Sequence, residues 1–176
     1  SNIELDSTPG TGSTFSFKIG LRLVEPVYIG ESRKAEKIKD FTGIRALVAE
    51  DNELNMEIIK LMLENVGCVV SCVSDGKQAV DTFKNAPAGS FDIIFMDVMM
   101  PVMNGLEAAH KIRISGHPDG KSIPIVAVSA NAFDEDISQS LASGMNAHLS
   151  KPIDSAKLIK TMGEQLELKD SIWADK

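Results

Sequence analysis

The sequence has few cysteines and no long apolar run. Its two cysteines, Cys68 and Cys72, are too few for a disulfide scaffold, and its three histidines do not stand at spacings that would complete a zinc site. No apolar run approaches the roughly 20 residues that cross a bilayer, and no basic segment followed by an apolar one marks a signal peptide. We therefore expect a cytoplasmic protein with reduced thiols, and any membrane anchor of a parent protein would lie outside this chain.

Basic residues are also in deficit, because 18 lysines and arginines face 25 aspartates and glutamates, for a formal net charge of −7. Such a chain lacks the positive surface that binds nucleic acid, and it has no electrostatic attraction to anionic lipid. We therefore expect no nucleic-acid partner and no direct membrane contact. Apolar residues make up 43% of the 176 residues, which is typical of a globular chain and allows one domain with an appendage.

The first 24 residues form a unit of their own. Two segments of alternating apolar and polar residues, 3–7 and 14–19, flank a turn-forming stretch rich in glycine, which is the pattern of a β-hairpin. A lone hairpin is marginal in water, so it should need a partner surface. Residues 25–42 include a run of mixed charges and are predicted to be a linker.

From residue 44 onward, short apolar runs alternate with segments of helical periodicity. The runs that we predict as buried parallel strands are 44–49, 69–73, 91–96, 124–128 and 147–149. The predicted helices are 52–66, 76–85, 106–114, 133–143 and 155–166. In the first helix the apolar residues at helical spacing are Leu54, Ile58, Leu61, Met62 and Leu63. Five β-α repeats with right-handed crossovers predict an α/β fold, a doubly wound five-stranded parallel sheet with helices on both faces.

Polar residues stand where the predicted strands end. Glu50 and Asp51 follow the first strand, Asp97 follows the third, Ser129 ends the fourth and Lys151 follows the fifth. Ligands of such sheets bind outside the carboxyl ends of the strands, so these side chains should share one pocket. Taken singly, each has an ordinary alternative role: Asp51 as a helix N-cap, Ser129 as a cap or turn residue, and Lys151 as a solvated side chain.

Three clustered carboxylates need a cation, because two unit charges 4 Å apart repel by about 4 kcal/mol at an effective dielectric of 20. Clustered oxygens suit Mg²⁺, which leaves positions for phosphoryl oxygens. A carboxylate beside Mg²⁺, with a lysine and a hydroxyl nearby, can act as a nucleophile toward a phosphoryl group. A soft metal would require a cysteine or histidine beside the methionines, so packing is the favoured role of Met96, Met99, Met100 and Met103.

The motifs around these residues resemble the receiver domain of two-component response regulators. They are Glu50-Asp51, FMDVMMPVMNG at 95–105, VSA at 128–130 and LSKP at 149–152. The resemblance covers about residues 43–168 and implies a flavodoxin-like sheet with strand order 2-1-3-4-5. It implies that Asp97 is the phospho-acceptor, and that the Mg²⁺ ligands are Glu50, Asp51, Asp97 and the backbone carbonyl of Met99. It also implies that Ser129 is the switch hydroxyl and that Lys151, joined to Pro152 by a cis bond, pairs with the phosphoryl group.

One position departs from the best-known receiver pattern. The residue three before the lysine is often tyrosine or phenylalanine and reports the state of the switch, whereas here it is His148. A histidine at this position is similar to receivers attached to sensor kinases, and it makes His148 a candidate switch residue. The alternative, a partly exposed histidine without a signalling role, stays open.

The hairpin also has a family resemblance. The segment IELDSTPGTGSTFSFKI at 3–19 resembles the last two strands of the ATP-binding domain of histidine kinases. A kinase end, a charged linker and a receiver follow each other in a hybrid sensor histidine kinase. We therefore predict a hairpin remnant at 1–24, a linker at 25–42, a receiver at 43–168 and a C-terminal tail at 169–176.

The implied function is a Mg²⁺-dependent transfer from phosphohistidine to Asp97. The donor would be the chain's own or a cognate histidine kinase core, and the phosphoryl group would pass to a histidine-phosphotransfer domain or protein, or be hydrolysed. The enzyme would be the parent histidine kinase, since this chain lacks the ATP-binding core. A receiver-like interaction module without phosphorylation is the alternative. A phosphohydrolase would need an acid two positions after Asp97, where Met99 stands. The oligomeric state stays open.

Overall fold

A computed structural model describes residues 3–10, 12–18, 40–130 and 133–174 of the chain. The chain divides into two compact units, Ser1–Glu36 and Lys37–Lys176, and each is described by itself. Most of the predicted linker at 25–42 lies outside the described residues.

The first unit contains the predicted hairpin. Strands β1 (Ile3–Thr8) and β2 (Gly12–Phe17) pair antiparallel, and Ile3 lies opposite Phe17. Because side chains alternate along a strand, the apolar residues share one face, on which they are 60 to 73% exposed: Ile3, Leu5, Phe15 and Phe17. The hairpin thus has one apolar face and one polar face.

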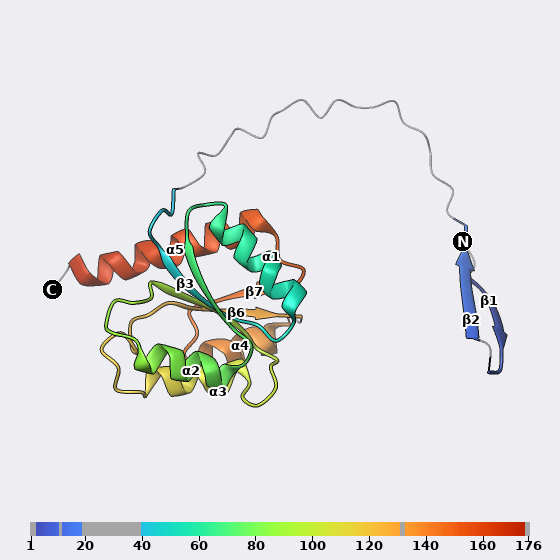
Figure 1. Cartoon of the computed structure of the whole chain (residues 1–176), viewed down its shortest axis with the longest axis horizontal. Helices are drawn as coiled ribbons and strands as arrows, with labels where there is room; N and C mark the ends of the chain where they lie inside the picture. Colours follow the sequence, from blue (N-terminus) through green and yellow to red (C-terminus); the bar gives the residue numbers. More distant parts are fainter. Residues whose placement is uncertain (1–2, 11, 19–39, 131–132, 175–176) are drawn as a thin grey trace, which may run out of the picture. The chain divides into compact units, whose positions relative to one another are not determined.

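The second unit is the predicted five-stranded parallel sheet, with strand order β4-β3-β5-β6-β7 (Figure 1). Its strands are β3 (Arg45–Ala49), β4 (Val69–Val73), β5 (Ile93–Asp97), β6 (Ile125–Ser129) and β7 (Ala147–Ser150). All four neighbouring pairs are parallel. Counted within this unit the order is 2-1-3-4-5, so the predicted fold class is confirmed.

Five helices alternate with these strands. They are α1 (Glu53–Glu64), α2 (Gly76–Asn85), α3 (Gly105–Arg113), α4 (Asp134–Ala142) and α5 (Ser155–Ala174). Helices α2 and α3 cover one face of the sheet, where Phe83 and Ile112 pack on Leu47. Helices α1 and α5 cover the other face, where Leu63 and Leu158 pack in the second buried cluster. Burial on both faces explains why the central strands are apolar at nearly every position.

Two helices differ from the sequence prediction. In α1 the fully buried residues are Ile59 and Leu63, whereas Leu54, Ile58 and Leu61 are 39 to 70% exposed. Helix α5 was predicted to end at residue 166 but continues to Ala174, through most of the predicted tail. No glycine or proline follows Gly163, so nothing in the local sequence ends the helix earlier.

Candidate functional site

The predicted site residues gather at the carboxyl edge of the sheet. Glu50 directly follows β3, Asp97 is the last residue of β5, and Lys151 directly follows β7. Parallel register aligns these ends, since Asp97 pairs with Val128 in β6. One carboxylate oxygen each from Glu50, Asp51 and Asp97 lie within 4.8 Å of one another. The structure therefore brings the predicted carboxylates together.

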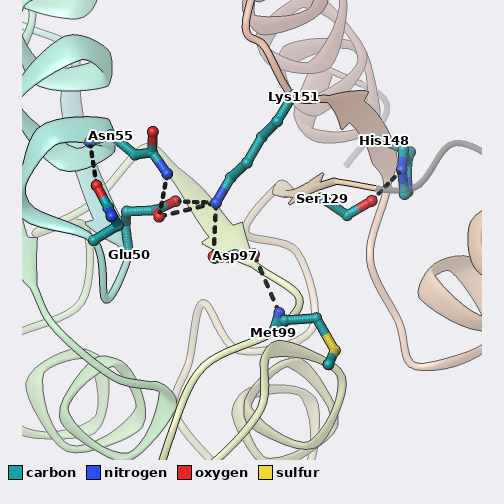
Figure 2. A network of polar contacts seen from close by, with 8 residues as sticks. Glu50, Asn55, Asp97, Met99, Ser129, His148 and Lys151 are labelled. Atoms are coloured by element: carbon teal, nitrogen blue, oxygen red, sulfur yellow. Dashed lines mark hydrogen bonds and ion pairs between the residues drawn. The ribbon is translucent and has the colours of Figure 1, made fainter. Parts of the chain in front are cut away.

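Lys151 links two of these carboxylates (Figure 2). Its Nζ lies 2.9 Å from Oε1 and 2.7 Å from Oε2 of Glu50, and 2.8 Å from Oδ2 of Asp97. Burial lowers the pKa of the Lys151 ammonium, but the hydrogen bonds to Asp97 and Glu50 and the charges of these carboxylates outweigh it, so the pKa stands above its usual value. The side chain of Lys151 is therefore bound by two carboxylates and is not a freely solvated lysine. The Lys151–Pro152 bond is cis, as predicted.

Asp97 is 4% exposed and both of its oxygens have donors. The backbone N–H of Met99 donates to Oδ1 at 3.1 Å, and Lys151 donates to Oδ2. Gly105, at the start of α3, lies so close that a Cβ there would collide with the backbone carbonyl oxygen of Asp97. The loop after β5 is thus folded tightly against the residue that ends the strand.

The donor set fits a hard divalent cation. Glu50 is fully buried, and its Oε2 accepts no hydrogen bond from any residue that the structure describes. Lys151 approaches that oxygen as an ion pair without hydrogen-bond geometry. Asp51 is exposed, and it does not cap α1, because the N-cap is Asn52. A buried carboxylate oxygen with unused acceptor capacity, beside two further carboxylates, matches the oxygen ligands that Mg²⁺ takes.

Ser129 and His148 meet on the neighbouring strands β6 and β7. Ser129 Oγ lies 3.0 Å from His148 Nε2, and Ser140 Oγ in α4 lies 3.4 Å from His148 Nδ1. Ser129 does not cap the following helix, whose N-cap is Phe133. The structure therefore joins the predicted switch hydroxyl directly to the predicted switch histidine (Figure 2).

Sequence reasoning missed Asn55, in the first turn of α1. Its side-chain Nδ2 donates to Glu50 Oε1 at 3.0 Å. The available signal was its place one helical turn beyond Glu50-Asp51, but a polar residue in a first turn is too common to single out.

An exposed apolar strip lies beside the site. Leu54, Ile58 and Leu61 stand at positions i, i+4 and i+7 of α1, so they share one face of the helix. Ile58 also lines a cavity of about 130 Å³ together with Asn55, Lys151, Pro152 and Ile153. The strip therefore reaches the rim of the pocket that holds Lys151.

No helix among the described residues combines the length and the apolar character needed to cross a bilayer.

Comparison with known proteins follows the same part of the chain. Residues 46–163 match the family model of the response regulator receiver domain. The osmosensing histidine protein kinase SLN1 of Saccharomyces cerevisiae is 42% identical over 123 residues, which cover 68% of this chain and 10% of that kinase. The chain therefore spans a small fraction of the length of this curated relative.

Similar solved structures include two receiver domains. The receiver domain of sensor histidine kinase PA1611 from Pseudomonas aeruginosa, which has a magnesium ion coordinated in its active site cleft, is 35% identical with a TM-score of 0.64 over 72% of this chain and 99% of that one. The receiver domain of Ssk1 from Saccharomyces cerevisiae was solved with the histidine phosphotransfer protein Ypd1. That match is 31% identical with a TM-score of 0.61, over 69% of this chain and 88% of that one.

Proposed function

The chain belongs to the response regulator receiver domain family, and from this premise we propose that it is the phospho-accepting receiver of a hybrid sensor histidine kinase. The environment of Asp97 carries the proposal. Its carboxylate is buried, contacts the ammonium of Lys151 at 2.8 Å, and lies in a cluster with Glu50 and Asp51. A nucleophile, a cation and a set of metal ligands are thus in one place, as phosphoryl transfer requires.

The proposed reaction moves a phosphoryl group from a phosphohistidine of a kinase core to Asp97. A carboxylate oxygen of Asp97 forms a bond to phosphorus while the P–N bond breaks. The electron pair of that bond stays on the imidazole nitrogen, which takes up a proton from water. Lys151 supplies positive charge where the phosphoryl oxygens arrive, and the Ser129 hydroxyl donates a hydrogen bond to one of them. The acyl phosphate then passes to a histidine of the next protein or is hydrolysed.

We assign the Mg²⁺ ligands to Glu50, Asp51, Asp97 and the backbone carbonyl of Met99. The unused acceptor capacity of Glu50 Oε2 supports this assignment. When bound, Mg²⁺ would neutralise the charge that develops on the transferring phosphoryl oxygens. Without a cation beyond Lys151, the three carboxylates are not fully compensated.

The proposed downstream partner is a histidine-phosphotransfer domain or protein. The similar Ssk1 receiver was solved with such a protein. The apolar strip of Leu54, Ile58 and Leu61 supports the proposal, because it gives a partner helix a surface beside Lys151 and Pro152. A partner seated there would present its histidine toward Asp97 from the open side of the pocket.

The hairpin at 1–24 is proposed to be the last two strands of a kinase ATP-binding domain. Its exposed face of Ile3, Leu5, Phe15 and Phe17 supports this role, because such a face is normally covered by the rest of a sheet domain. The proposal assigns only these two strands to such a domain, and it assigns no ATP-binding core to this chain. The chain would then support transfer to its own Asp97 but would not phosphorylate itself from ATP.

The test is phosphorylation of the whole chain by acetyl phosphate with Mg²⁺, followed by intact mass. Wild type and Asp81→Asn, an exposed aspartate on α2, should each gain one phosphoryl group, whereas Asp97→Asn should gain none. ATP in place of acetyl phosphate should give no labelling. Equal labelling of Asp97→Asn would overturn the assignment of the acceptor, and labelling by ATP would overturn the account of the hairpin. An unlabelled wild type would favour a non-phosphorylated interaction module.

A further inference from the structure

Asn55 has no role in the reaction as proposed so far, yet it contacts the most buried carboxylate of the site. Its Nδ2 lies 3.0 Å from Glu50 Oε1, and its own backbone N–H is fixed by a hydrogen bond to Asn52 Oδ1 at 3.0 Å (Figure 2). The side chain is short and stands in the first turn of α1, so it has little freedom to leave Glu50. Asn55 is thus a fixed donor to Glu50.

Glu50 depends on only two donors among the residues that the structure describes. Asn55 Nδ2 and Lys151 Nζ both donate to Oε1, and Lys151 alone approaches Oε2. The side chain of Glu50 is 1% exposed, so water does not replace a lost donor easily. A buried carboxylate without donors is costly. The two donors therefore decide whether Glu50 keeps its position beside Asp51 and Asp97.

The two donors differ in whether they can keep their hydrogen bonds to Glu50 when a phosphoryl group arrives at Asp97. The ammonium of Lys151 has three carboxylate oxygens within 2.9 Å, two of Glu50 and one of Asp97. Two of its three protons form hydrogen bonds, to Glu50 Oε1 and Asp97 Oδ2, and its approach to Glu50 Oε2 is an ion pair without hydrogen-bond geometry. When phosphoryl oxygens arrive at Asp97, an ammonium that turns toward them weakens its contacts to Glu50. The hydrogen bond of the Asn55 side chain goes to Glu50 and not to Asp97, so the arrival of a phosphoryl group at Asp97 does not compete for it.

We propose that Asn55 is a positioning residue that holds Glu50 in place among the metal ligands when Lys151 turns to the phosphoryl group. The inference rests on the proposed function. In this proposal Lys151 moves toward the phosphoryl group, whereas the amide of Asn55 stays in place and keeps Glu50 oriented. Removal of a residue that orients a metal ligand typically lowers metal affinity by about 10- to 100-fold.

The test compares Mg²⁺ affinity with and without beryllium fluoride, which stands in for the phosphoryl group, by calorimetry on the whole chain. Asn55→Leu keeps the approximate shape but removes the donor, and Asn55→Gln keeps an amide. Asn65→Leu, the same change at the exposed C-cap of α1, is the matched control. We expect Asn55→Leu to weaken Mg²⁺ binding about tenfold with beryllium fluoride and less than threefold without it. Asn55→Gln should recover part of the loss, and Asn65→Leu should match wild type.

The possible outcomes separate this inference from the proposed function. If wild type is not phosphorylated on Asp97, the proposed function fails first. If wild type is phosphorylated but Asn55→Leu binds Mg²⁺ like wild type in both conditions, the positioning role is refuted. An equal loss in both conditions would also refute it, because Asn55 would then support the site independently of Lys151. Should Asn55→Leu unfold, Asn55→Ala provides the same comparison, with the thermal midpoint as the check on folding.

Discussion

The loops at the amino ends and at the carboxyl ends of the parallel strands, called here the amino edge and the carboxyl edge of the sheet, contain glycine for different reasons. At the amino edge, each of the five loops that lead into a strand contains a glycine with φ between 74 and 95°, as at Gly116. At the carboxyl edge, the glycines Gly76 and Gly105 have ordinary φ values and instead allow close packing of the backbone. The one positive φ at a non-glycine residue, among those described, is at Val102 on this edge.

The edges also hold their partly buried cations differently. At the carboxyl edge Lys151 faces two carboxylates, which hold its pKa above the usual value. At the amino edge Arg113 faces only neutral oxygens, and burial lowers the pKa of its guanidinium to about 10. Arg113 donates to the carbonyls of Gly144 and Gly120 and to Asn146 Oδ1 at 2.7 to 2.9 Å.

This contrast supports the proposal that the chemistry takes place at the carboxyl edge. At the amino edge the partly buried Arg113 has neutral partners, and the turns are relaxed at glycine. The carboxyl edge concentrates like charges, a shared cation and a strained turn, which are features that persist only where the surrounding structure enforces them. Substitutions at matched positions on the two edges should therefore have unequal and distinguishable effects.

The largest difference is expected between two glycine-to-alanine changes. Gly105→Ala places a Cβ against the carbonyl oxygen of Asp97, so it should lower the free energy of unfolding by about 3 kcal/mol and slow phosphorylation. Gly116→Ala meets no atom within 4 Å and should cost only the conformational penalty, about 1 kcal/mol. Urea unfolding of both variants measures the contrast. Equal losses would show that close packing at Asp97 is not a special demand of this edge.

A second difference is expected between the two cations. Lys151→Met leaves the buried carboxylates of Glu50 and Asp97 without a cation, and Arg113→Met removes the side-chain donor from the carbonyls of Gly144 and Gly120, so each should cost about 2 kcal/mol. Only the loss in Lys151→Met should shrink when Mg²⁺ is added, because among the described residues the cluster of three carboxylates lies at that edge. Thermal unfolding with and without Mg²⁺ checks this. An equal response of both variants to Mg²⁺ would contradict the division between the edges.

The loss in Lys151→Met should also depend on pH in one direction. A raised pKa in the folded state means that Lys151 stabilises the fold fully below its usual pKa of 10.5. That contribution is lost as the pH rises through the higher folded value. The difference in unfolding free energy between wild type and Lys151→Met should therefore be constant from about pH 7 to 9 and shrink above about pH 10.5. A difference that falls steadily through neutral pH would contradict the raised pKa.

The sequence predicted the carboxyl edge better than the amino edge, for a physical reason. Strand ends can be located from apolar runs, and parallel topology then brings residues such as Glu50, Asp97 and Lys151 together. The partners of Arg113 could not be predicted in this way, because they are loop carbonyls whose positions depend on turn geometry. Periodicity likewise placed Leu54 on α1 but did not show that it faces solvent.

The smallest effect is expected at the strained turn itself. Met103 N–H donates to the carbonyl oxygen of Pro101 at 2.7 Å, two residues back, which closes a γ-turn around Val102. The φ of Val102 is 67°, a value that a β-branched residue rarely adopts. Its side chain is 80% exposed, so packing does not explain the choice of residue. The strain should therefore be removable without disturbing the core.

Val102→Gly should raise the free energy of unfolding by about 1 kcal/mol, because relief of a strained φ exceeds the entropy that glycine adds to the unfolded chain. Val102→Ala, which loses the branched side chain but still resists a positive φ, should change stability much less. Urea unfolding of both variants measures the difference. If Val102→Gly is no more stable than wild type, the turn is not strained, and the contrast with the glycine turns of the amino edge loses this part of its support. If it is more stable, the carboxyl edge stores strain in the loop that follows Asp97, at the place where phosphorylation would act.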